Sequence, residues 1–224
     1  MESVNLHTMT CALLLLTLLG TGPAGREAVQ ADSQSVVLEL HPQRDRYRGA
    51  TELFVTLSES TRRIALESRG LEPSRIELVD GKGRVDLVWG ERPAGTLLLE
   101  ARRDIAAGPL CIRVAFDGAY PDSAPGLVRT GRGRRARLRS AFAFGGASAA
   151  FPCMTGVGPQ SWTLTIEVPA THQLRTNLGR QRTGYAPGVR TSVFRSRRPI
   201  PADSLRIEEG PRLPRRGPSR LLQR

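Results

Sequence analysis

The stretch Trp-Thr-Leu-Thr-Ile-Glu-Val at residues 162–168 alternates apolar and polar side chains at every position. Successive side chains of a β-strand point to opposite faces of the sheet, so the apolar residues of this stretch would share one buried face. Similar segments occur at residues 36–40, 52–57 and 110–116. This repeated pattern predicts β-strands that are buried on one side.

Further segments with strand character lie between these, and short turns rich in Gly, Pro and Asp separate them. They are residues 63–66, 75–79, 85–89, 96–100 and 190–194. No segment after residue 35 has apolar residues at helical spacing over a length that would cover a sheet. The sequence therefore predicts an all-β fold, a sandwich of antiparallel sheets with about 10 to 13 strands.

The N-terminus contains an uninterrupted apolar run, Cys-Ala-Leu-Leu-Leu-Leu-Thr-Leu-Leu, at residues 11–19. The run is too short to span a bilayer and has the length of a signal-peptide core, and Val29 and Ala31 fit a cleavage site. The first ten residues lack Lys and Arg, so a buried apolar segment of the fold remains an alternative. We expect a signal peptide at residues 1–31, export to the periplasm or medium, a β domain at residues 32–207 and no stable membrane anchor.

The chain is strongly basic, with 33 Lys and Arg residues against 21 Asp and Glu residues and a formal net charge of +12. Such a charge suggests a nucleic acid or another anionic partner. Lys82 is the only lysine, however, and a bias this strong toward arginine is typical of GC-rich coding. An exported protein meets little nucleic acid, so nucleic acid is not expected as a partner.

Arginines are densest at residues 129–139, where Gly residues interrupt them; the six are Arg129, Arg132, Arg134, Arg135, Arg137 and Arg139. Two interpretations remain open for this segment: a solvated loop or hairpin tip, and a site that binds an anion or a partner. Residues 208–224 are rich in Pro and Arg without periodicity and are predicted to be a disordered tail. The neighbouring Glu208 and Glu209 are therefore not expected to form a catalytic pair.

Few residues suggest chemistry. Cys111 and Cys153 remain after signal removal, and they would form a disulfide or two buried thiols. His41 and His172 lie far apart in the sequence, so no metal site and no cofactor are expected. Trp89 and Trp162 belong to alternating segments and are expected in the core.

Three sets of residues resemble one family, in the same order along the chain. The first is Leu-Glu-Leu-His-Pro at residues 38–42 followed by Tyr-Arg-Gly at 47–49, and the second is the strand that ends in Phe-Asp-Gly at 116–118. The third is Phe151, Pro152 and Cys153, followed by Gln-Ser-Trp at 160–162 and, later, Pro-Ile-Pro at 199–201. Over residues 36–207 the chain resembles the N-terminal, saddle-like β domain of aminopeptidase N-type zinc metallopeptidases.

The resemblance implies where activity would reside. In that family a separate catalytic domain carries His-Glu-x-x-His, and this sequence lacks that motif. The family's β domain supplies a Gln-x-Glu motif, which binds the amino terminus of the substrate. When the motif is aligned on Phe142, Ala141 takes the place of its Gln and Ala143 the place of its Glu. The methyl groups of these alanines cannot bind an ammonium ion. We expect no catalytic or substrate-binding residue, and a non-catalytic accessory or protein-interaction module.

Two other functions remain open. The chain would be part of a split metallopeptidase if the catalytic domain is a separate chain, and that chain would then be its protein partner. It would be a truncated metallopeptidase if the catalytic domain has been lost. Alternatively, it would be a basic module that binds acidic glycans or lipid headgroups through residues 129–139.

Overall fold

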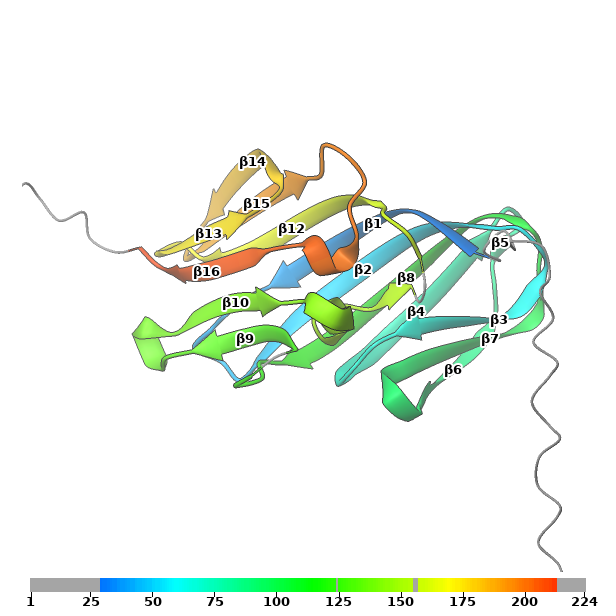
Figure 1. The fold of residues 1–224 in the computed structure, drawn as a ribbon, viewed down its shortest axis with the longest axis horizontal. Coiled ribbons are helices and arrows are strands. Elements are labelled where there is room, and N and C mark those ends of the chain that lie inside the picture. The colour runs from blue at the N-terminus through cyan, green and yellow to red at the C-terminus, as the bar shows by residue number, and fades with distance from the viewer. Residues whose placement is uncertain (1–28, 124, 155–156, 213–224) are drawn as a thin grey trace, which may run out of the picture.

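The computed structural model describes residues 29–123, 125–154 and 157–212, which form sixteen strands and four short 3-10 turns (Figure 1). The strands are β1 (Val29–Glu39), β2 (Arg46–Leu57), β3 (Thr61–Glu67), β4 (Leu71–Asp80), β5 (Gly83–Arg84), β6 (Leu87–Arg92), β7 (Thr96–Ile105), β8 (Gly108–Ala119), β9 (Gly126–Thr130), β10 (Arg137–Ala141), β11 (Cys153–Met154), β12 (Ser161–Pro169), β13 (His172–Thr176), β14 (Gly179–Ala186), β15 (Val189–Arg195) and β16 (Ile207–Pro211). The turns are η1 (Pro93–Gly95), η2 (Gly133–Arg135), η3 (Ala143–Ala149) and η4 (Ala202–Ser204). The expected all-β sandwich is confirmed.

One large sheet organises the fold. Its eight strands follow the order β14-β15-β12-β1-β2-β8-β4-β5, and two smaller sheets have the orders β13-β16-β10-β9 and β11-β3-β7-β6. All pairs are antiparallel except β1 and β12, which run parallel from Ser33 opposite Ser161 to Glu39 opposite Glu167. The large sheet is therefore mixed rather than purely antiparallel.

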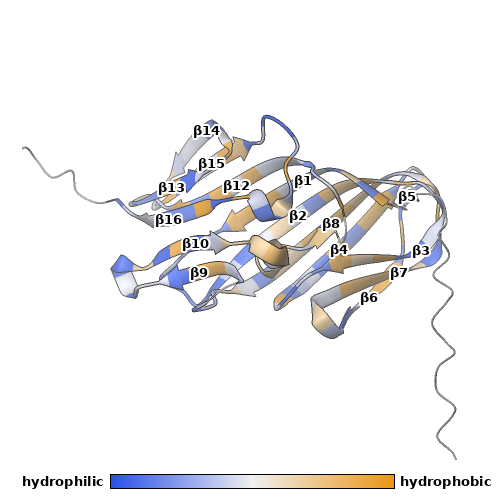
Figure 2. Cartoon of the chain, viewed as in Figure 1, coloured by the Kyte–Doolittle hydropathy of each residue, from blue (hydrophilic) through white to orange (hydrophobic). Residues whose placement is uncertain are grey.

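The two small sheets cover opposite halves of one face of the large sheet, and each encloses its own apolar core (Figures 1 and 2). The first core lies under β13-β16-β10-β9 and includes Trp162, Phe151 and Ile207, which are at most 1% exposed. The second core lies under β11-β3-β7-β6 and includes Leu53 and Leu97. The alternation seen in the sequence thus places the apolar side of each long strand under a small sheet.

A small buried polar group lies between the two cores. The side chain of Gln34 donates to Thr51 Oγ1 at 2.7 Å and to the carbonyl of Pro152 at 2.8 Å. Gln160 in turn donates to Gln34 Oε1 at 3.0 Å. These bonds compensate for the burial of the amide and fix the segment that carries Phe151 and Cys153 against the large sheet.

The two aromatic-x-Gly motifs of the sequence are partners across neighbouring strands. Tyr47 of β2 is opposite Gly118 of β8, and Gly49 of β2 is opposite Phe116 of β8. A Cβ on Gly118 would lie 2.3 Å from the Tyr47 ring, and a Cβ on Gly49 would lie 2.4 Å from the Phe116 ring. Each ring therefore covers the glycine of the other strand, and neither glycine tolerates a side chain.

Two expectations, the number of strands and the start of the β domain, need correction. The sixteen strands exceed the expected 10 to 13 because short or polar strands such as β5, β11 and β14 lack the alternating pattern. The β domain begins at Val29 rather than at residue 32, since Val29 and Ala31 pair with β2 and contact the second core. Residues 1–28, with the rest of the expected signal peptide, lie outside the described residues.

The expected disordered tail begins too early. Glu208 to Pro211 belong to β16, a central strand held between β13 and β10 by backbone pairing on both sides. The sequence conceals this strand because an acidic residue, Glu209, occupies its buried side. The remainder of the tail, residues 213–224, lies outside the described residues. No helix in the described part of the chain has the length and hydropathy needed to cross a membrane.

Candidate binding face

The arginine-rich segment forms a β-hairpin rather than an irregular loop. β9 and β10 pair from Thr130 opposite Arg137 to Gly126 opposite Ala141, and η2 forms the tip. The tip residues Arg132, Arg134 and Arg135 are exposed, and the hairpin end is the most hydrophilic part of this sheet in Figure 2. The hairpin-tip interpretation is therefore correct for the middle of the segment.

Arg129 does not belong with the other five arginines. Its Nη1 donates to the carbonyl of Arg44 at 2.7 Å and to Asp45 Oδ1 at 3.1 Å. Its guanidinium also lies 5.9 Å from the centre of the Tyr120 ring. These contacts hold Arg129 against the loop before β2, so its guanidinium group stabilises the fold.

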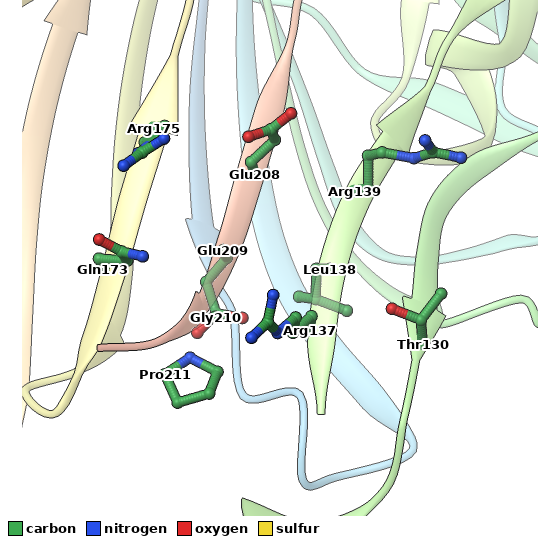
Figure 3. A pocket seen from close by; sticks show the side chains of 10 residues that line it. All are labelled: Thr130, Arg137, Leu138, Arg139, Gln173, Arg175, Glu208, Glu209, Gly210 and Pro211. Carbon is green, nitrogen blue, oxygen red and sulfur yellow. The ribbon is translucent and has the colours of Figure 1, made fainter. Parts of the chain in front are cut away.

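Arg137 and Arg139 line a groove of about 560 Å³ on the outer surface of the sheet β13-β16-β10-β9 (Figure 3). Arg175 and Gln173 of β13 form the opposite side, and the floor is β16, with Glu208 and Gly210 facing outward. The stem of Arg137 packs over Gly210, where an added Cβ would lie 3.0 Å from Cγ of Arg137. The groove therefore follows β16 between two rows of basic and polar side chains.

The strand register sets the spacing of these groups. Arg139 of β10 and Arg175 of β13 are both opposite Glu208, one on each side of β16. Neighbouring strands lie about 4.8 Å apart, which separates the two arginine positions by roughly 10 Å. Arg137 and Arg139 are two residues apart on one strand, a separation of about 7 Å along the groove.

Eight of the twelve arginines in residues 29–124 form ion pairs with acids, whereas in residues 125–212 only Arg129 forms one with a described residue. Ion pairs within the described residues join Arg46 to Glu72, Arg63 to Glu100, Arg103 to Asp80 and Arg113 to Glu52, among others. Arg137, Arg139 and Arg175 form no ion pair with any described residue. These three cations outnumber Glu208, the exposed carboxylate of the same groove, so the groove attracts anions.

The charge of the chain is divided unequally between its halves. Residues 29–124 carry 13 basic and 15 acidic side chains, and residues 125–212 carry 15 arginines and four carboxylates. The first half thus has a net charge of −2 and the second a net charge of +11. The second half supplies the whole of the sheet that carries the groove. The positive potential is therefore concentrated where the unpaired arginines lie.

Beneath the groove, the inward side of the same sheet contains a buried ionisable cluster. His172 of β13 hydrogen-bonds through Nδ1 to Glu209 Oε1 of β16, and both side chains are at most 3% exposed. Arg190 of β15 is 6% exposed. Glu209 Oε2 and the Nε and Nη2 atoms of Arg190 have no hydrogen-bond partner among the described residues. A buried polar group without a partner costs free energy, so this cluster is sensitive to protonation.

The pKa shifts of the cluster have a common cause. Burial raises the pKa of Glu209 from its ordinary 4.5 to about 8, although the positive charge of Arg190 opposes the shift. Burial, together with the charge of Arg190, lowers the pKa of His172 below 6.5. At neutral pH the pair therefore consists of a neutral imidazole and a protonated carboxyl group that share one proton.

Ala141 and Ala143, which the sequence resemblance would align with the family's Gln-x-Glu, lie outside the groove. Ala141 ends β10 and Ala143 begins η3, while Phe142 between them is buried against Phe151 with ring centres 5.6 Å apart. The neighbouring Phe144 is 98% exposed and has a φ of 55°. Phe142 thus stabilises the core, and no side chain at either flanking position offers a charge.

The motif Phe151-Pro152-Cys153 has a structural role. All three residues are buried, and Phe151 contacts Trp162 with ring centres 5.8 Å apart. Cys153 and Cys111 are both free thiols, so the two cysteines do not form the disulfide that was one of the two alternatives. Trp162 lies in the core as expected, but Trp89 on the edge strand β6 is 41% exposed, which corrects the expectation for that residue.

No group of three or more His, Cys, Asp and Glu residues that could hold a metal ion occurs within the described ranges. Sequence reasoning identified Arg137 and Arg139 but missed Arg175 and Glu208 of the same groove. Arg175 lies 36 residues after Arg139, and only the pairing of both strands with β16 brings them to one surface.

No protein-family model matches this chain, and no curated protein sequence matches it significantly.

Proposed function

We propose that this protein is an exported, non-catalytic binding module that docks an acidic protein partner in the groove lined by Arg137, Arg139 and Arg175. The observation that carries the proposal is that three arginines surround one groove and form no ion pair with a described residue, while eight of the twelve arginines in residues 29–124 are paired with acids. A guanidinium group binds carboxylates through two parallel hydrogen bonds, so unpaired arginines at fixed positions suit an acidic partner.

The resemblance to the aminopeptidase N-type β domain supports the non-catalytic part of the proposal. Phe151, Pro152 and Cys153 fill the core, as scaffold residues do. Ala141 and Ala143 offer only methyl groups where the family has a polar pair. A domain that keeps its scaffold and lacks these polar groups is suited to binding rather than to catalysis. The apolar run at residues 11–19 supports export.

Electrostatics determines how such a partner would bind. One exposed arginine–carboxylate contact contributes about 0.2–1 kcal/mol, so affinity requires several contacts together. Ions screen such contacts over about 10 Å at 0.1 M salt, and binding should therefore weaken steadily as salt is added. The net charge of the second half would accelerate association with an acidic partner.

The test is binding of the chain to immobilised poly-glutamate, measured by biolayer interferometry at several salt concentrations. A variant with Arg137, Arg139 and Arg175 changed to Gln should lose most of the binding. The matched control changes Arg182, Arg198 and Arg206, which are exposed in the same half but outside the groove, and removes the same charge. Equal losses in both variants would show that net charge, not the groove, binds the acid, and would contradict the proposal.

A second candidate function is that of an accessory chain of a split metallopeptidase. Phe144 favours it, since a fully exposed aromatic ring lies one residue after Ala143, the position at which the family's β domain meets its substrate. Its backbone is held in the left-handed region by neighbours, including a 2.8 Å hydrogen bond from Gly145 N to Asp203 Oδ2. An exposed large apolar residue in a strained backbone is a feature of contact surfaces.

The second candidate predicts a stoichiometric complex with a chain that contains His-Glu-x-x-His and has zinc-dependent aminopeptidase activity. Phe144→Ser should dissociate that complex, and the same change at the exposed Val88 on the distant strand β6 should not. A purified chain that remains a monomer in the presence of such a peptidase would eliminate this candidate.

A further inference from the structure

We infer that the edge strand β6 is a self-association surface, through which two copies of this chain pair antiparallel about a twofold axis at Trp89. This inference is independent of the groove and of the proposed function. β6 is the last strand of the sheet β11-β3-β7-β6, and it lies at the end of the molecule away from the β9–β10 hairpin (Figure 1). Pairing between two copies of β6 would join their two sheets into one continuous sheet.

β6 is the least protected of the sheet edges in the described part of the chain. β5 and β11 have two residues each, and β14 is polar and contains a bulge. Hydrogen bonds from neighbouring segments reach β9, where Arg129 N donates to a loop carbonyl, and β13, where Arg180 donates to the carbonyl of Leu174. β6 instead exposes 53% of Val88 and 41% of Trp89. An exposed edge with apolar side chains is a template for pairing with another chain.

The backbone of β6 has its free groups at three positions. Arg102 N donates to the carbonyl of Asp86 at 2.9 Å, and the register of β6 with β7 continues from this pair. In an antiparallel pair, successive residues direct their backbone groups alternately toward and away from the partner strand. The N–H and C=O groups of Leu87, Trp89 and Glu91 are therefore directed toward the free edge.

These free groups restrict the register of a symmetric pair. Two residues exchange hydrogen bonds only where the backbone groups of both point toward the free edge, so the twofold axis passes through a residue and not between two residues. The extended segment 86–92 is centred on Trp89, and an axis there pairs the whole segment with its copy. Leu87 then lies opposite Glu91 of the second copy, and each pair of residues with free groups exchanges two hydrogen bonds.

The same register matches the side chains. Asp86 lies opposite Arg92 of the second copy at both ends of the pair, and both side chains are exposed and form no ion pair with a described residue. Val88 lies opposite Gly90, where an added Cβ would have no atom within 4 Å, so the valine has room to cover the glycine. The two Trp89 side chains lie opposite each other at the axis. Opposite-charge and aromatic cross-strand pairs each contribute about 0.2–1 kcal/mol.

The charge distribution permits this association, and the size of the interface makes it weak. Residues 29–124, which include β6, have a net charge of −2, and the strongly basic sheet that carries the groove lies at the other end of the molecule (Figure 1). One strand pair buries less than the roughly 1,200 Å² of stable complexes. We therefore expect a dissociation constant on the order of 100 µM.

The test is sedimentation velocity of the full chain from about 5 to about 500 µM, over which the monomer should convert to a dimer. Asp86→Arg and Arg92→Asp each place like charges opposite one another at both ends, and each should weaken the dimer about tenfold. An equimolar mixture of these two variants should regain the affinity of the unmodified chain, because each end then joins unlike charges. Trp89→Ser should also weaken the dimer. Arg44→Asp, at an exposed position outside β6 in the same half, is the matched control and should dimerise normally.

Three results would overturn the inference. The first is a chain that stays monomeric at about 500 µM, which would leave β6 free for a strand of a different protein. The second is a dimer that Asp86→Arg and Arg92→Asp leave unchanged, because its interface would then lie elsewhere. The third is a mixture of the two variants that dimerises no better than either alone, which would exclude the register centred on Trp89. Binding to poly-glutamate through the groove is a separate measurement, and none of these results alters its outcome.

Discussion

Between pH 6.5 and about 8 the folded protein keeps the proton that His172 and Glu209 share beneath the groove, whereas the unfolded chain has lost it, so the protein should lose stability over this interval. The carboxyl group of Glu209 is almost fully buried, and one of its oxygens has no hydrogen-bond partner among the described residues. Arg190 supplies a positive charge nearby, but it forms no ion pair with Glu209. An ionised Glu209 would therefore be poorly compensated in the folded protein.

The sign follows from the protons held by the pair in each state. Just below pH 6.5 the unfolded chain holds a proton on His172 and the folded pair holds one on Glu209, so the fall in stability begins only as the pH rises above 6.5. Between 6.5 and about 8 the folded pair keeps its proton and the unfolded chain has none, so stability falls as the pH rises.

The expected magnitude comes from the width of that interval. Each pH unit in which the folded state holds one extra proton costs about 1.4 kcal/mol of unfolding free energy, so the whole interval costs roughly 2 kcal/mol. The surrounding charges, Arg190 with Arg180 and Arg212 near it, remain positive throughout. They do not change the sign.

Urea unfolding followed by the fluorescence of the buried Trp162 measures this effect at intervals from about pH 5.5 to pH 9. Glu209→Gln leaves only His172, whose lowered pKa makes stability rise up to pH 6.5 and then stay constant. Glu208→Gln is the matched control, since this neighbour on β16 is exposed. It should retain the profile of the unmodified protein. A fall of the same size above pH 6.5 in Glu209→Gln would refute the reasoning.

Other predictions concern the core, the exposed ring and the thiols. Trp162→Ala should lower the free energy of unfolding in urea by about 3–5 kcal/mol, since the ring fills the first core and its N–H donates to the carbonyl of Ile200 at 2.9 Å. The control Trp89→Ala, at a partly exposed position, should lower it by less than about 1 kcal/mol. Phe144→Gly should raise the melting temperature, because it relieves about 1 kcal/mol of backbone strain at a positive φ and removes no buried surface. A lowered melting temperature would show instead that the Phe144 ring stabilises the fold. A thiol reagent should modify both cysteines only slowly, because burial raises the pKa of Cys111 to about 11 and raises that of Cys153 further. Full modification of both thiols within seconds would contradict this prediction.

Much of the fold could be predicted because local alternation and long-range packing agree in its long strands. Segments such as residues 162–168 place every second side chain in a core, so their pattern survives in the sequence. The pairing of Tyr47 with Gly118 and of Gly49 with Phe116 explains why both motifs have the same aromatic-x-Gly form. Which strands pair could not be predicted, because alternation shows which face is buried and not which neighbour covers it.

The parts that sequence reasoning missed share a physical cause. β14 is an exposed edge strand with polar side chains on both faces, and β16 places an acid in the core. Hydropathy alternation does not detect either strand, since β14 has no buried face and β16 buries an ionisable side chain. The groove depends on β16. Because the sequence predicts a disordered tail where β16 lies, it gave no indication of the groove either.

The excess of arginine in this chain has two separable parts. A coding bias toward arginine replaces lysine wherever a cation occurs, and Lys82 as the only lysine is consistent with that throughout the sequence. Such a bias does not remove carboxylates, yet residues 125–212 have only four, and residues 29–124 have 15. The scarcity of acids is confined to the half that forms the groove sheet and its hairpin. Composition alone thus explains the choice of arginine over lysine, and the proposed binding role of the groove would explain why its arginines form no ion pair with a described residue.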